Sequence, residues 1–262
     1  MNTYLTRKVF RKLSGARNYW SDSKRLLYTH LVFWGSIMPY FVPQRCEEQA
    51  RFVDSYEYSA VVMRNPWNRI ASAYWDKMEV MALREKPCNE FLESCCELRR
   101  GLFGAGVPCG PDSAPSFSDF LSAVEAQMIE LGETNDHWER QTRLCNLGAV
   151  PYRRVFDLVR DRDAVLEYIG ATPEDVAAVQ SPFTSAHKRS PEKKAEAFLE
   201  LYGITGWDRS GRIPEPPPLA ALVGRMYKDD IEFARLHGIE YTFEGAVAQA
   251  TGVALDASRS HE

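Results

Sequence analysis

The stretch YSAVVMRNPWNRIASAYWDKM, residues 58–78, decides the fold that we predict for this chain. It opens with the apolar run Ala60–Met63, which is typical of a strand buried on both faces. Asn65 offers an oxygen that can cap a helix, and Pro66 stands where a first helical turn tolerates proline. The stretch therefore predicts a strand, a tight turn and a helix.

The predicted helix is amphipathic, because apolar residues recur at helical spacing. Its apolar face consists of Trp67, Ile70, Ala71, Tyr74 and Met78. Its polar face consists of Asn65, Asn68, Arg69, Ser72 and Asp76.

Arg64 lies between the predicted strand and the helix N-terminus. The free N–H groups of a helix start and a guanidinium that donates two hydrogen bonds together favour an anion. Ser72 lies about 10 Å farther along the helix at 1.5 Å per residue, so a ligand lying beside the helix could reach both side chains. An ordinary surface ion pair of Arg64 is the alternative, and geometry alone leaves both open.

Residues 64–74, RNPWNRIASAY, resemble the 3′-phosphate-binding motif of the Golgi-type carbohydrate sulfotransferases and their bacterial relatives. The resemblance implies that Arg64 and Ser72 bind the 3′-phosphate of the sulfate donor 3′-phosphoadenosine 5′-phosphosulfate (PAPS). It also implies an α/β fold, a P-loop-like parallel sheet with helices on both faces and the 58–63 strand at its centre. A kinase of the P-loop class is the rival nucleotide enzyme, but the sequence lacks G-x-x-x-x-G-K-[ST].

The N-terminal residues depart from the family pattern. In such sulfotransferases a first strand and a lysine-containing loop hold the 5′-phosphosulfate. Residues 3–15 resemble the helix that follows this loop, which makes Asn2 and Thr3 its last residues. The sequence does not contain the loop lysine at the expected place: either the start is misassigned, or the chain is a fragment, or Lys8 replaces that lysine. We therefore expect a sheet that lacks a strand beside residues 58–63, and a chain that is a poor catalyst or an inactive binding domain.

Two histidines are candidates for the catalytic base. Residues 28–33, YTHLVF, resemble the family segment that crosses the active site, which favours His30. Residues 137–141, HWERQ, resemble a second signature and make His137 the second candidate. A core histidine is the alternative for His30.

The uncharged residues 26–44 contain Gly and Pro, so we expect a helix that leads into a buried loop rather than a membrane span, and we find no convincing signal peptide.

Later segments complete the expected domain, residues 1–244, with residues 245–262 as a flexible tail. Residues 152–158 predict a strand that ends in an acid, and residues 219–237 one last helix. Residues 184–190 resemble the basic loop that closes over the nucleotide phosphates, with Lys188 and Arg189 as the candidates; a solvated basic turn is the alternative.

Residues 84–115 form a Cys/Gly/Pro-rich insertion, which we expect over the acceptor-binding face. We expect helices over residues 89–100 and 116–124. The cysteines of the insertion predict either disulfides in a secretory lumen or free thiols; they are Cys88, Cys95, Cys96 and Cys109.

The bulk numbers limit the function classes. The 262 residues suffice for one sizeable α/β domain, and a net charge of −4 does not suggest a nucleic-acid binder. No cysteine pair has the zinc-site spacing, so no metal is expected. The family implies PAPS and a glycan-type acceptor as partners. It implies membrane association and a Golgi lumen for a eukaryotic protein, and the cytoplasm for a bacterial one.

Overall fold

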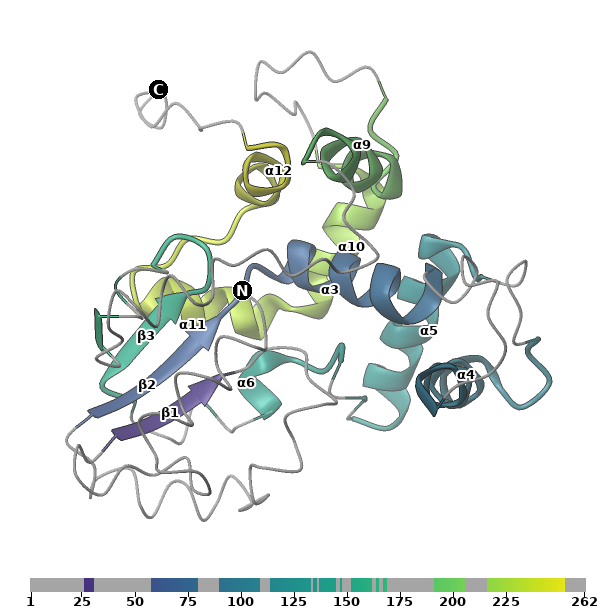
Figure 1. The fold of residues 1–262 in the computed structure, drawn as a ribbon, viewed down its shortest axis with the longest axis horizontal. Helices are drawn as coiled ribbons and strands as arrows, with labels where there is room; N and C mark the ends of the chain where they lie inside the picture. Colours follow the sequence, from purple (N-terminus) through teal and green to yellow (C-terminus); the bar gives the residue numbers. More distant parts are fainter. Residues whose placement is uncertain are drawn as a thin grey trace. The chain divides into compact units, whose positions relative to one another are not determined.

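The structure is a computed structural model that describes residues 26–30, 58–79, 90–108, 114–132, 134–135, 137–144, 147, 152–161, 164, 167–168, 191–205 and 216–252. The chain divides into two compact, interleaved units (Figure 1). The first, here the sheet unit, comprises Met1–Asn65, Arg140–Arg189 and Asp229–Tyr241. The second, here the helical unit, comprises Pro66–Glu139, Ser190–Lys228 and Thr242–Glu262. Each unit is described by itself.

Three parallel strands form the sheet unit's described sheet, in the order β1–β2–β3 (Figure 1). The strands are β1 (Leu26–His30), β2 (Tyr58–Met63) and β3 (Arg154–Asp157). Ala60–Met63 of the middle strand are fully buried, with 0% exposure at each residue. The predictions of a central, doubly buried strand at this position and of a parallel sheet are confirmed.

Strand β1 corrects two expectations. We expected a helix leading into a loop from Leu26 and an open position beside β2, but Leu26–His30 pair in parallel with β2 from Leu26–Tyr58 to His30–Val62. The run is too short for its periodicity to separate helix from strand. Since residues 31–57 leave ample length for a parallel connection, pairing with β2 satisfies the backbone of both segments.

Strand β3 confirms the predicted strand that ends in an acid. After Asp157, the N–H of Leu158 donates to the carbonyl of Met63 at 2.8 Å and continues the ladder with β2. Asp157 Oδ1 accepts the N–H groups of Val159 (2.8 Å) and Arg160 (2.7 Å). The aspartate side chain thus turns the chain where the strand ends. The unit also contains α6 (Gln141–Leu144) and most of α11 (Lys228–Leu236).

The helical unit packs its helices around aromatic side chains. Its elements are α3 (Pro66–Tyr74), the π-helix η1 (Trp75–Glu79), α4 (Glu90–Phe103), α5 (Phe117–Glu130), α9 (Pro191–Leu201), α10 (Pro218–Met226) and α12 (Phe243–Thr251). The ring of Phe243 lies 5.0 Å from that of Tyr202 and 6.2 Å from that of Trp67, between centroids. These contacts join α12, α9 and α3 in one core.

Helix α3 begins at Pro66, as predicted, and all five residues of its predicted apolar face are buried. The predicted polar face is wrong at Asn65 and Arg69, each 2% exposed. Arg69 Nη1 donates to the carbonyl of Glu139 at 2.5 Å, so a hydrogen bond compensates the burial of the guanidinium. Asn68 donates to the carbonyl of Ala246 at 3.2 Å. The helix is therefore covered on more sides than its sequence indicates.

The insertion contains the predicted helices. Helix α4 extends three residues beyond the expected end, to Phe103, and α5 begins after Ser116, whose Oγ accepts the N–H of Asp119 at 3.1 Å. Cys96 of α4 forms a disulfide, so the disulfide alternative is correct for this cysteine. Cys88 and Cys109 lie outside the described residues.

Two expectations near the C-terminus are wrong. The single helix expected over residues 219–237 is two helices, α10 and α11, separated at Tyr227. Residues 245–251 belong to α12, not to a flexible tail. Thr242 Oγ1 caps its start by accepting the N–H of Gly245 at 2.9 Å, and Gly252, with φ of 69°, ends it. Among the helices that the structure describes, none is long and apolar enough to cross a membrane.

Candidate active site

Arg64 follows β2 directly and is fixed through its backbone by Gln141. The N–H of Arg64 donates to Gln141 Oε1 at 2.9 Å, and its carbonyl accepts from Gln141 Nε2 at 2.9 Å. The side-chain amide of Gln141 thus pairs with Arg64 as the backbone of a neighbouring strand would. The pairing holds the residue at the point where β2 ends.

The buried carboxylate of Asp230 fixes Gln141 in turn. Asp230, with 0% exposure, accepts the N–H of Gln141 through Oδ2 at 2.8 Å and that of Thr142 through Oδ1 at 2.8 Å. Its Oδ1 also accepts the Thr142 hydroxyl at 2.8 Å. Because these residues begin α6, the carboxylate occupies that helix N-terminus and compensates its unpaired N–H groups. The chain Asp230–Gln141–Arg64 therefore links α11 to the end of the central strand.

His30 and Arg64 lie at the same edge of the sheet. His30 is the last residue of β1 and pairs with Val62, two residues before Arg64. Asp157 ends β3 opposite Met63. The carboxyl ends of parallel strands meet at one edge, and open α/β sheets bind their ligands outside that edge. The structure therefore brings the first candidate base and the candidate phosphate ligand to one end of the sheet.

Tyr241 is buried close to this edge, 6% exposed. Its pKa is raised well above the ordinary value by burial, and further by the charges of Asp157 and Asp230. A side-chain interaction with Asp157 also raises this pKa, although within the described part of the chain the Tyr241 hydroxyl and Asp157 Oδ2 lack the geometry of a full hydrogen bond. The hydroxyl of Tyr241 thus stays protonated near two carboxylates.

Ser72 lies on α3, in the helical unit, and is half-buried. Its hydroxyl forms no hydrogen bond within the described part of the chain, which suits a phosphate ligand. Arg64 belongs to the other unit, so the structure describes the two residues separately. Their shared role stays a prediction.

His137 lies in a self-braced loop of the helical unit. Asn135 Oδ1 accepts the backbone N–H of His137 at 3.0 Å and also contacts ring Nδ1. Since the N–H identifies this atom as the oxygen, Nδ1 carries the ring proton, and Nε2 is the basic nitrogen of the neutral imidazole. Thr134 N–H donates to Glu139 Oε2 at 2.6 Å and closes the loop. The loop thus sets both the position and the tautomer of this histidine.

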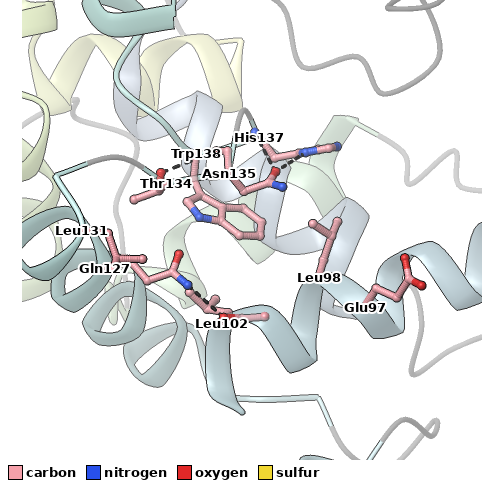
Figure 2. Close-up of a pocket in the computed structure, with 10 residues that line it drawn as sticks. Glu97, Leu98, Leu102, Gln127, Leu131, Thr134, Asn135, His137 and Trp138 are labelled. Atoms are coloured by element: carbon pink, nitrogen blue, oxygen red, sulfur yellow. Dashed lines mark hydrogen bonds between the residues drawn. The ribbon is translucent and has the colours of Figure 1, made fainter. Parts of the chain in front are cut away.

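A hollow of about 590 Å³ opens beside this loop (Figure 2). Three segments contribute its described lining: Glu97, Leu98, Gly101 and Leu102 of α4, Gln127 and Leu131 of α5 and its end, and Thr134, Asn135, His137 and Trp138 of the loop. Three of these ten lining residues are leucines, and six have side chains that can form hydrogen bonds. Its wall includes α4, so the insertion lines a cavity, as an acceptor-binding role requires.

The remaining candidates lie outside the described residues: Asn2, Thr3, Lys8, Lys188 and Arg189. Sequence reasoning did not assign roles to Gln141 and Asp230. Gln141 closes the HWERQ signature, and Asp230 lies in the stretch that was expected to form one last helix. The burial of Asp230 in the first turn of α11 could not be predicted from the periodicity of the sequence, because acidic residues at helix starts are ordinarily exposed. Among the described residues, no group of three His, Cys, Asp or Glu side chains is placed to hold a metal.

Comparison with known proteins identifies the family but no individual relative. A family model described as "Sulfotransferase family" matches residues 7–233. No curated protein and no solved structure matches the chain. The match spans most of the chain and contains β1–β3, Arg64, Gln141 and Asp230. The chain therefore belongs to the sulfotransferase family.

Proposed function

We propose that this chain transfers a sulfuryl group from PAPS to a hydroxyl of a carbohydrate. Family membership supports sulfuryl transfer, and the RNPWNRIASAY motif supports PAPS as donor. The observation that carries the proposal is the sheet edge, where His30 ends β1 and the Asp230–Gln141 pair holds Arg64 at the end of β2. An edge of this kind is where α/β proteins bind nucleotides.

The residues fit a bisphosphate donor. The guanidinium of Arg64 supplies a positive charge at the sheet edge, and the Ser72 hydroxyl supplies a donor on α3. In the reaction the acceptor oxygen attacks sulfur, the bond between sulfur and the phosphate oxygen breaks, and adenosine 3′,5′-bisphosphate leaves. The base removes the proton of the acceptor hydroxyl. The chain's task is to position the partners, stabilise charge and take that proton.

Either His30 or His137 serves as the base. His30 shares the sheet edge with Arg64, whereas His137 faces the hollow in the helical unit. Imidazole suits the task because its ordinary pKa lies near neutrality. The variants His30→Asn and His137→Asn distinguish them: loss of the base lowers turnover at least about a hundredfold and leaves bisphosphate affinity unchanged.

Arg64→Ala tests the donor site. We expect the Kd for adenosine 3′,5′-bisphosphate, measured by calorimetry, to rise about a hundredfold, since a charge-assisted contact to phosphate is worth roughly 1.5–3 kcal/mol. Arg235→Ala, an exposed arginine of the same unit paired with Glu232, is the control and should leave the Kd unchanged.

Equal affinity of the wild-type and Arg64→Ala proteins would refute the assignment of Arg64. Tight bisphosphate binding without transfer of labelled sulfate to any sugar would favour the other possibility, an inactive sulfotransferase-like binding domain. Transfer to phenols alone would reject the carbohydrate acceptor.

A further inference from the structure

The orientation of the Gln141 side-chain amide decides whether it can hold Arg64. The N–H of Arg64 needs an acceptor and its carbonyl needs a donor, and Oε1 and Nε2 of Gln141 meet them in that order, each at 2.9 Å. An amide turned by half a rotation would place oxygen against oxygen and donor against donor, and both bonds would be lost. Gln141 has 0% exposure, so surface water does not replace a lost bond.

Asp230 is placed to set this orientation. Its Oδ2 accepts the backbone N–H of Gln141 at 2.8 Å and lies 3.5 Å from the side-chain Nε2 of the same residue. Since Nε2 carries two hydrogens, it can donate one to the carbonyl of Arg64 while the other faces the carboxylate. An ionised carboxylate only accepts hydrogen bonds, and its negative charge repels the amide oxygen. Asp230 therefore favours the one orientation of Gln141 that matches the backbone of Arg64.

The carboxylate of Asp230 is itself held in place. It is fully buried, and its Oδ1 accepts both the N–H and the hydroxyl of Thr142, each at 2.8 Å. Beside it, Arg140 and Asp229 form an ion pair at 3.3 Å, in which the side chain of Asp229 is 62% exposed. Successive residues of one segment thus pair with successive residues at the start of α11. All of them belong to the sheet unit, as does Arg64.

We propose that Asp230 is a positioning residue of the donor site, which sets the orientation of the Gln141 amide and thereby holds Arg64 where it meets the 3′-phosphate. The assignment rests on the proposed function for the ligand, since the RNPWNRIASAY motif assigns this phosphate to Arg64. The hold on Arg64 follows from the contacts alone. In this role Asp230 acts through Gln141 and not on the nucleotide itself.

The wild-type protein gives the first test, by hydrogen exchange in isotopically labelled protein. Both hydrogens of the Gln141 side-chain amide should exchange slowly with solvent, because one faces the carbonyl of Arg64 and the other faces Asp230. Fast exchange of either hydrogen would overturn the proposal. This measurement needs no substitution, so it holds even where a variant fails to fold.

Asp230→Asn tests the hold on Arg64. Asparagine keeps the shape of the side chain, but it has a single oxygen for the N–H groups of Gln141 and Thr142, and its NH2 group faces one of these donors. We expect the backbone amide of Arg64 to exchange at least about tenfold faster in this variant, because its acceptor is no longer fixed. Asp229→Asn is the matched control. It removes the neighbouring carboxylate, which pairs with Arg140 instead, and should leave the exchange rate unchanged.

Nucleotide selectivity tests the positioning role. Calorimetry compares adenosine 3′,5′-bisphosphate with adenosine 5′-monophosphate, which lacks the 3′-phosphate. We expect Asp230→Asn to weaken binding of the bisphosphate about tenfold, the equivalent of one hydrogen bond, and to change binding of the monophosphate less than about twofold. Thr142→Val loses the hydroxyl bond to Asp230 but keeps the backbone N–H bond, so it should be less stable and yet bind both nucleotides as the wild-type protein does.

A double variant shows whether Asp230 acts through Gln141. Asp230→Asn combined with Gln141→Leu should bind the bisphosphate no more weakly than Gln141→Leu alone, because the amide that Asp230 orients is already absent. Losses that add, equal weakening of both nucleotides by Asp230→Asn, or an unchanged exchange rate at Arg64 would overturn the proposal. If the wild-type protein bound no bisphosphate, the proposed function would fall, and the exchange rate of Arg64 would still show whether Asp230 holds this residue.

Discussion

At the scale of single residues, the amide of Gln141 connects the family signature to the phosphate-binding motif. Its two bonds hold the backbone of Arg64, and the carboxylate of Asp230 holds the N–H of Gln141 itself. Both polar atoms of its side-chain amide are engaged by the backbone of Arg64. It therefore acts as a positioning residue for the Arg64 guanidinium.

Gln141→Leu should weaken the binding of adenosine 3′,5′-bisphosphate about tenfold and lower the free energy of unfolding by about 2 kcal/mol. Two hydrogen bonds are lost, each worth roughly 1 kcal/mol, and Arg64 is released from its position. Gln127→Leu loses one bond, to the carbonyl of Gly101, and is the control. It should leave the bisphosphate Kd unchanged. A Gln141→Leu protein that is less stable but binds the bisphosphate normally would show that the contact is structural only.

Two buried tyrosines are expected to respond differently to loss of the hydroxyl. Tyr202 donates to the carbonyl of Trp67 at 3.0 Å, so Tyr202→Phe should cost about 1 kcal/mol of stability at pH 7. The Tyr241 hydroxyl has no well-formed hydrogen bond within the described residues and interacts only loosely with Asp157, so Tyr241→Phe should cost less stability than Tyr202→Phe. Urea unfolding of both variants at pH 7 measures the difference.

The same variants test the raised tyrosine pKa values at alkaline pH. Below about pH 10 the phenol is neutral in both states. Above about pH 10 the unfolded chain loses the phenol proton, whereas folded Tyr241 keeps it because its pKa is raised. The stability of the fold is therefore lost as pH rises from about 10 through the folded pKa of Tyr241. We expect Tyr241→Phe to flatten this loss between pH 9.5 and 11. An unchanged slope would contradict the assignment.

Sequence reasoning at this scale identified which residues matter better than it identified their surroundings. Arg64 could be placed because a strand end followed by Asn-Pro has a local signal. Arg69 was expected on a polar face, and only the carbonyl of Glu139, remote in sequence, explains why it is buried. Asp230 was missed for the same reason, because its partners lie 88 and 89 positions away along the chain.

At the scale of elements, local signals predicted the strands and helices with strong patterns. The doubly buried run of β2 and the helix expected over residues 116–124 were both recognised. Strand β1 was not, because Leu26–His30 is defined by its pairing with β2 rather than by its own pattern. Residues 245–262 were expected to be a tail because they are small and polar, yet residues 245–251 are helical and bury Ala246 and Val247.

Helix α12 depends on its capping threonine. Thr242→Ala removes the Oγ1 that accepts the N–H of Gly245, so we expect a loss of about 1 kcal/mol in stability. Thr251→Ala at the other end is the control: its hydroxyl bonds back to the carbonyl of Val247, a contact that adds little in a helix, and alanine favours the helix. Thermal unfolding measures both. Equal losses would show that α12 is held by packing alone.

At the scale of the whole molecule, the chain builds two compact units from alternating segments. It passes from one unit to the other after residues 65, 139, 189, 228 and 241. The first passage falls inside the motif that decides the predicted fold, between Arg64 and Ser72. Composition and periodicity describe each element but carry no signal for such a division, because it depends on contacts between distant segments. The single domain expected over residues 1–244 accordingly contains parts of both units.

The alternating segments also determine when this protein can fold during its synthesis. Asp230, which completes the hold on Arg64, leaves the ribosome well after Arg64 itself, about ten to thirty seconds later at roughly 5–20 residues per second. Until then the nascent chain carries the fully apolar run Ala60–Met63 without its final surroundings. Both units are completed only by segments after residue 228. During translation this apolar run is therefore exposed to aggregation, and the hold on Arg64 is completed only when the segment after residue 228 has emerged.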